Sequence, residues 1–184
     1  MARRVLSAAC ACCGNYSQTV LVGFTEQAQA AITCAQHEAQ SLGHTEVQVE
    51  HLLLGLFSQQ QDVAAQLLAD SGLTVEPVRD LVRTRFGTKP GSVPEEHPRF
   101  SLPAKDLLTS AYRFGMGEAD TAHILIVIVA KGEGARDILR SLGADPDRLR
   151  FEAKMRALPQ DARSTRPQLK ATVRPMLPEL DFGD

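Results

Sequence analysis

The amino-acid sequence predicts an all-α domain made of two pseudo-symmetric four-helix repeats, with flexible N- and C-terminal tails. A series of short motifs occurs twice: FTE at 24–26 returns as FSL at 100–102, and EHLL at 50–53 returns as AHIL at 122–125. Apolar residues recur at helical spacing within both copies. A repeat this long, with several helices per copy, is typical of one domain built from two halves rather than of a solenoid.

The offset between the two copies shortens along the chain. Phe24 matches Phe100, and His51 matches His123. The separation between the two histidines is shorter than the separation between the two phenylalanines. The second repeat has therefore lost about four residues between its first and second helices, as the change in offset shows.

The first repeat contains four helix signals. Thr25 is a good N-cap with Glu26 in the first turn, Gly43 and Gly72 are stop signals, and Thr74 precedes a run with a proline in its first turn. The predicted helices cover residues 25–42, 49–57, 62–71 and 75–86.

The second repeat follows a turn-rich linker, and its predicted helices cover residues 101–114, 121–130, 134–142 and 146–157. Asp145-Pro146 is a strong helix start. The β-branched run Ile124–Val129 alone favours a strand, but its twin at 52–57 favours a helix, so we expect a helix.

The predicted organisation is a Cys-containing leader over residues 1–23, a double-repeat domain over 24–157 and a disordered tail over 158–184. The domain divides into repeat one at 24–86, a linker at 87–99 and repeat two at 100–157. Prolines are frequent from Pro159 onward, with mixed charge and little periodicity, which favours disorder there.

Composition excludes several classes of function. The formal net charge of −2, the pI near 6.2 and the lack of a Lys/Arg cluster argue against nucleic-acid binding. The longest apolar run is too short to span a bilayer, so no membrane role is expected. Three cysteines packed into residues 10–13 do not form a disulfide framework, and we expect a cytoplasmic protein.

Four segments of the first repeat carry a family resemblance: FTEQAQ at 24–29, SLGH at 41–44, VEHLLLGL at 49–56 and DVAAQLLADSGL at 62–73. They resemble the Clp N-terminal repeat domain of ClpA- and ClpC-type unfoldases, and the likeness extends more weakly over the second repeat to residue 157. No GxxxxGK[ST] phosphate loop occurs in the chain, so the resemblance is to the recognition domain alone, as a stand-alone protein without the ATPase modules. No cofactor is expected.

The resemblance implies binding of substrates and adaptors and, in ClpC-type members, of phosphorylated arginine. Thr25 at one helix start and Glu50 at another would supply a hydroxyl with helix N–H groups for the phosphate and a carboxylate for the guanidinium. In repeat two Ser101 keeps the hydroxyl as a possible second site, but Ala122 replaces the acid, unless Glu118 or Asp120 substitutes for it. The alternative is that Thr25 and Glu50 are ordinary helix-start residues.

The resemblance also implies an inter-repeat surface around Phe100 and Lys105, where adaptors and cyclic-peptide ligands dock in the family. Core packing is the alternative role of Phe100. His51 and His123 recur at equivalent helix starts, and we interpret them as packing residues because no nucleophile or acid recurs with them.

The sequence therefore predicts a non-catalytic protein- or peptide-binding module of the Clp protease system, with a ClpC-type unfoldase, its substrates or its adaptors as partners. It would either deliver ligands or sequester them. The alternative is a metal- or redox-active protein that uses Cys10, Cys12 and Cys13, although a zinc knuckle would need a second cysteine pair. No nucleophile–base pair or carboxylate dyad indicates an enzyme.

Overall fold

The computed structural model describes residues 23–87 and 98–157 of the 184-residue chain. Within the first of these ranges the chain forms four helices and one very short strand. These are α1 (Glu26–Ser41), β1 (Glu46–Val47), α2 (Val49–Leu56), α3 (Val63–Asp70) and α4 (Val75–Phe86).

The second described range repeats this arrangement. Its elements are β2 (Arg99–Phe100), α5 (Leu102–Phe114), α6 (Thr121–Lys131), α7 (Glu133–Ser141) and α8 (Pro146–Ala157). The prediction of an all-α fold of two four-helix repeats is confirmed, and Ile124–Val129 lies within α6 rather than in a strand. Residues 1–22 of the predicted leader, most of the linker and the predicted tail lie outside the described residues.

Equivalent local chemistry starts the first helix of each repeat. The Thr25 hydroxyl accepts a hydrogen bond from the Ala28 amide at 3.3 Å, and the Ser101 hydroxyl accepts one from the Ala104 amide at 3.4 Å. Such N-caps satisfy backbone donors that the helix itself leaves without partners. The shared cap explains why these helix starts could be predicted from the sequence.

The turns after α3 and α7 also match. Gly72 and Gly143 have positive φ values of 75° and 81°, and each amide donates to the carbonyl three residues earlier. Glycine adopts this conformation without the steric cost of a Cβ atom, which is why it ends helices. The two halves are thus pseudo-symmetric at their turns as well as at their caps.

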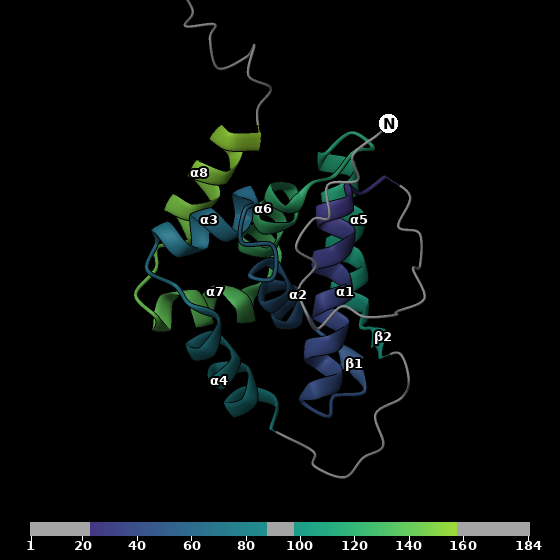
Figure 1. Ribbon diagram of the computed structural model, residues 1–184, viewed down its shortest axis with the longest axis vertical. Coiled ribbons are helices and arrows are strands. Elements are labelled where there is room, and N and C mark those ends of the chain that lie inside the picture. The colour runs from purple at the N-terminus through teal and green to yellow at the C-terminus, as the bar shows by residue number, and fades with distance from the viewer. Residues whose placement is uncertain (1–22, 88–97, 158–184) are drawn as a thin grey trace, which may run out of the picture.

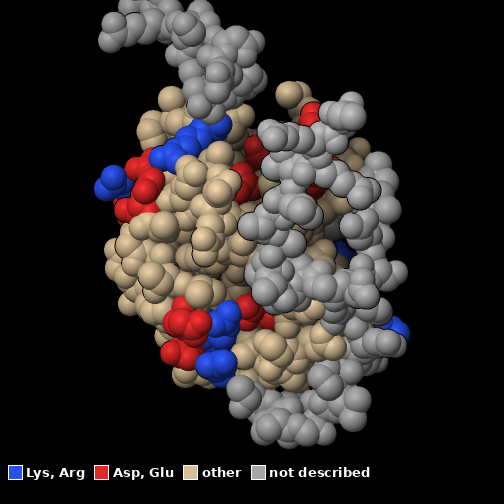
Figure 2. All heavy atoms as spheres, in the orientation of Figure 1, with Lys and Arg blue, Asp and Glu red and all other residues tan. Residues whose placement is uncertain are grey.

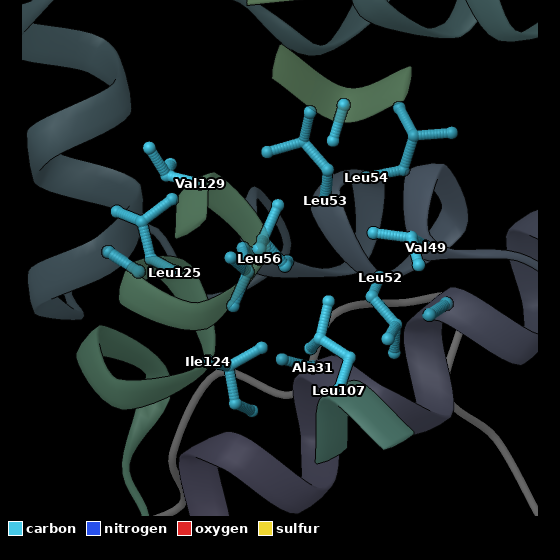
Figure 3. Close-up of a cluster of buried hydrophobic side chains, with 14 of the residues drawn as sticks. Ala31, Val49, Leu52, Leu53, Leu54, Leu56, Leu107, Ile124, Leu125 and Val129 are labelled. Carbon is cyan, nitrogen blue, oxygen red and sulfur yellow. The ribbon is translucent and has the colours of Figure 1, made fainter. Parts of the chain in front are cut away.

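The core is built around α2 and α6, which lie in the middle of the fold between α1 and α5 on one side and the remaining helices on the other (Figure 1). Every residue of α2 is buried, including Glu50 and His51, so the whole helix belongs to the core. Figure 3 shows leucines of α2 meeting apolar side chains of α1, α5 and α6. The labelled side chains of this cluster include Ala31, Leu52, Leu56, Leu107, Ile124 and Leu125.

The two repeats are joined crosswise. β1 and β2 are parallel, with Val47 opposite Phe100, so the entry to α5 lies beside the entry to α2. Phe24 forms the equivalent bridge with Ala119, so the entry to α1 lies beside the entry to α6. Neither pairing follows from the sequence, and Arg99, which is expected in the linker, is instead the first residue of β2.

The surface of the described residues carries both signs of charge. Acidic and basic side chains are intermixed on the visible face rather than separated by sign (Figure 2). Among the described helices, none is long and apolar enough to cross a membrane.

Candidate functional site

Thr25 lies at the junction between α1 and α6. Its amide donates to the Ala119 carbonyl at 3.0 Å, while its hydroxyl caps α1. In the second repeat the Ser101 amide donates to the Val47 carbonyl at 3.1 Å, which ties α5 to the start of α2. Each of these helix starts is therefore tied to the other repeat.

Glu50 lies at the opposite end of the α1–α2 hairpin from Thr25. His51 Nε2 is 2.8 Å from His44 Nδ1, and His44 follows the C-terminal end of α1, whereas Gly55 packs against the middle of α1. Since α1 has 16 residues, which rise about 24 Å, Thr25 and Glu50 do not meet. The antiparallel packing of α1 and α2 therefore places Thr25 and Glu50 at different ends of the hairpin, so they do not share one site in this structure.

Glu50 already has a guanidinium partner in its own chain. Its side chain is 9% exposed, and its Oε1 atom lies 3.7 Å from Arg85 Nε in the last turn of α4. Arg85 is 44% exposed, and its Nη1 atom is 3.9 Å from Asp137 Oδ2 on α7. The pair is nearly buried on the acid side and open to solvent on the arginine side.

Gly134 in the first turn of α7 makes room for this pair. A Cβ atom at position 134 would be 2.0 Å from Glu50 Oε1 and 3.0 Å from the central guanidinium carbon of Arg85. Such distances are inside van der Waals contact, so a side chain at position 134 would have to displace the Glu50 carboxylate and the Arg85 guanidinium. The sequence shows a basic residue in the last turn of α4 and a glycine at the start of α7. It does not show that α2, α4 and α7 meet at one site.

The residues predicted for the inter-repeat surface lie together at the start of α5. Phe100 is half-buried against the core, and Lys105 is exposed one turn into the helix. Between them Leu102 is 75% exposed, an apolar side chain that the sequence analysis did not single out. Ser101 is 6% exposed, so its hydroxyl is mainly a cap.

The second repeat offers no free acid at the position that matches Glu50. Ala122 there is fully buried. Asp120 caps α6, and its Oδ1 is 2.7 Å from His123 Nδ1. Burial alone would raise the pKa of Asp120, but hydrogen bonds and charge from His123 hold it below its usual value. Asp120 is therefore committed to its helix start, while Glu118 is exposed.

His51 is a structural residue, as the packing interpretation requires. It is fully buried, and its Nδ1 accepts a hydrogen bond from the Gln48 amide at 2.8 Å, which caps α2. Burial, reinforced by the neighbouring His44, lowers the pKa of His51 to about 3. The SLGH motif at 41–44 was the sequence signal for this partner.

The cysteine cluster Cys10, Cys12 and Cys13 lies outside the described residues. Cys34, on α1, is buried. Within residues 23–87 and 98–157 no group of three or more His, Cys, Asp or Glu side chains is arranged to hold a metal ion.

Comparison with known proteins agrees with this architecture. The family model described as "Clp repeat (R) N-terminal domain" matches residues 23–115. The chain is similar to the chaperone protein ClpC1, chloroplastic, of Oryza sativa subsp. japonica, with 37% identity over 134 residues that cover 70% of this chain and 14% of that protein. The chain thus spans about one seventh of the length of this relative.

Solved structures show the same fold. The N-terminal domain of the chaperone ClpD from Arabidopsis thaliana aligns with a TM-score of 0.62 and 29% identity over 73% of this chain and 97% of that one. The Hsp104 N-terminal domain from Candida albicans aligns with a TM-score of 0.58 and 20% identity over 71% of this chain and 88% of that one, and supports the fold alone. The chain belongs to the Clp repeat N-terminal domain family.

Proposed function

We propose that this chain is a non-catalytic module that captures protein or peptide segments for a ClpC-type unfoldase system. Membership of the Clp repeat family supports the general role. The observation that carries the site is the Glu50–Arg85 pair, in which a nearly buried carboxylate lies 3.7 Å from a half-exposed guanidinium. Such a pair offers both signs of charge to an incoming ligand.

Phosphoarginine is the ligand that this pair would suit. Its guanidinium would pair with the Glu50 carboxylate, and its phosphate would attract Arg85, which solvent can reach. Arg85 would then move from Glu50 to the phosphate, so the internal pair would be exchanged for two ligand pairs. Thr25 has no part in this site, because it lies at the far end of α1.

The inter-repeat surface would hold the rest of the bound segment. Phe100, Leu102 and Lys105 present an aromatic ring, an exposed apolar side chain and a positive charge along the start of α5. An apolar side chain of an adaptor, a substrate or a cyclic peptide would cover Leu102, and an acidic group would pair with Lys105. Surfaces of this kind commonly bind through a few central anchors.

The test is binding of a fluorescent peptide that carries one phosphoarginine, measured by anisotropy, against the same peptide with plain arginine. We expect Glu50→Gln and Arg85→Gln each to weaken binding of the phosphorylated peptide, and Glu46→Gln, an exposed acid on β1, to leave it unchanged. Equal binding of both peptides, or equal affinity of Glu50→Gln and wild type, would remove Glu50 and Arg85 from the site.

A second assay distinguishes delivery of the ligand to the unfoldase from sequestration of the ligand. The chain is added in trans to a ClpC-type unfoldase with its protease, and degradation of a phosphoarginine-bearing substrate is followed. Faster degradation indicates delivery and slower degradation indicates sequestration. If the degradation rate is unchanged at chain concentrations that saturate peptide binding, the proposed role with the unfoldase is contradicted.

A further inference from the structure

Two histidines of the first repeat form a continuous hydrogen-bonded chain between α2 and the end of α4. His51 Nε2 is 2.8 Å from His44 Nδ1, and His44 Nε2 is 2.7 Å from the Gly87 carbonyl oxygen. At the other end, the Gln48 amide is 2.8 Å from His51 Nδ1. Every ring nitrogen of the two histidines therefore has a partner.

The backbone groups fix the direction of every proton in this chain. A backbone amide can only donate, so His51 Nδ1 is an acceptor and its proton is on Nε2. His51 Nε2–H then donates to His44 Nδ1, and His44 Nε2–H donates to Gly87, whose carbonyl can only accept. The arrangement is complete when both rings are neutral. A further proton on either ring would place two N–H groups opposite each other or opposite the Gln48 amide, and would break a hydrogen bond.

Phe86 closes over the two rings. Its ring centroid is 5.9 Å from that of His44 and 6.1 Å from that of His51. Beside the rings is a cavity of about 150 Å³, lined by His44, Thr45, Glu46, Gln48 and Phe86. Loss of the His44–Gly87 hydrogen bond would free the end of α4 and widen this cavity.

The charged groups on the elements next to the histidines lie on α1, α2, α4 and β1. On α1 Glu38 pairs with Arg79 of α4, and on α2 Glu50 pairs with Arg85 of α4. On β1 the Glu46 carboxylate is exposed and accepts a hydrogen bond from the Gln48 side chain. Two of the three carboxylates thus have a basic partner and the third is solvated, so a histidinium would gain little net attraction from them.

We propose that His44 and His51 form a proton-sensitive latch that holds Phe86 and Gly87 against the α1–α2 turn and releases them when the pair takes up a proton. Release widens the cavity, which is already open to solvent, and lets Arg85, one residue from Phe86, leave Glu50. The latch itself does not depend on the proposed ligand, since it rests on the hydrogen-bonded chain alone. Burial makes the neutral state of His51 the stable one while the latch is closed.

The test follows histidine side-chain nitrogen resonances of the full chain by NMR. At pH 7.5 we expect both rings to carry their proton on Nε2. As the pH is lowered from 7.5 toward 3, the Phe86 ring resonances and the Gly87 amide should shift together with one midpoint. Over the same range the hydrogen-exchange protection factor of the Gly87 amide, which donates to the Arg83 carbonyl, should fall at least tenfold.

Two variants complete the test. His44→Gln removes the ring that joins His51 to the Gly87 carbonyl, so the protection of Gly87 should no longer follow the wild-type pH response. His123→Gln alters the equivalent histidine of the second repeat and should leave the response intact. The latch is contradicted if Phe86 and Gly87 stay unchanged while the histidines titrate, or if His44→Gln keeps the wild-type response.

Discussion

Glu50 on α2 and Gly134 on α7 are so close that a Cβ atom at position 134 would be 2.0 Å from Glu50 Oε1. The contact joins the two repeats and explains a glycine inside the first turn of a helix. In an isolated helix alanine would be favoured over glycine by about 0.5–1 kcal/mol. Here the clash with the carboxylate opposes that preference.

Gly134→Ala is therefore expected to destabilise the fold by about 1–2 kcal/mol, as overpacking of a closely packed contact does. In a Glu50→Ala background the shortest contact is gone and only the Arg85 guanidinium, which is half-exposed and can move aside, remains near the new methyl group, so the same change should cost clearly less. Urea unfolding of the four proteins of this double-mutant cycle measures the coupling. An equal effect of Gly134→Ala in both backgrounds would show that the two positions do not interact.

Gly55 sets the distance between α1 and α2. A Cβ atom there would be 2.2 Å from the Ala31 carbonyl oxygen, a backbone atom that cannot move aside. We expect Gly55→Ala to cost about 2–3 kcal/mol. Gly72→Ala is the control, since the space around Gly72 is open and only its positive φ, worth about 1–2 kcal/mol, opposes a side chain. In thermal unfolding Gly55→Ala should have a lower Tm than Gly72→Ala. The reverse order would contradict the close contact of Gly55 with α1.

Thr121 at the start of α6 donates a hydrogen bond of 2.6 Å to Asp62, the N-cap of α3 in the other repeat. Thr121→Val keeps the shape and removes the donor. The expected loss of unfolding free energy is about 1.5–3 kcal/mol, the range for a hydrogen bond to a charged group. Thr109→Val, on the exposed face of α5, should change stability by less than about 0.5 kcal/mol. Chemical denaturation of both variants checks the difference.

Stability should fall as the pH drops below about 6.5, because the unfolded chain then protonates His51 while the folded chain does not. The pKa of His51 is lowered to about 3 in the fold, so its contribution is complete above pH 6.5 and is lost toward pH 3. The loss from this residue should reach about 1–1.5 kcal/mol by pH 5.5. Urea unfolding at pH 7.5 and 5.5 measures it, and His51→Gln should reduce the pH dependence. An unchanged dependence in His51→Gln would assign the effect to other groups.

The helices could be predicted from the sequence because their signals are local. Thr25, Ser101 and Gly143 act within one turn of their own helix, and the duplication identified Ile124–Val129 as a helix against its propensity. The crossed joining of the repeats could not be predicted, because the pairing of Val47 with Phe100 joins segments that are far apart in the chain.

The same limit applies to the candidate site. Glu50 was identified from its motif, but its partner Arg85 comes much later in the chain and lies on another helix. The repeat in the sequence shows that Thr25 and Ser101 occupy equivalent positions. It does not show whether α2 runs parallel or antiparallel to α1. Only the antiparallel packing of these helices separates Thr25 from Glu50.

Titration calorimetry with phosphoarginine tests the central proposal most directly. We expect one site per chain, because Ala122 is buried where the second repeat would need an acid. Glu50→Gln should weaken binding about 10- to 150-fold, which corresponds to about 1.5–3 kcal/mol for a hydrogen bond to a charged group, while Glu46→Gln should bind like wild type. Binding should also weaken with added salt, since Arg85 is partly exposed. Two equal sites, no heat of binding, or an affinity that is the same with and without the Glu50 carboxylate would contradict the proposal.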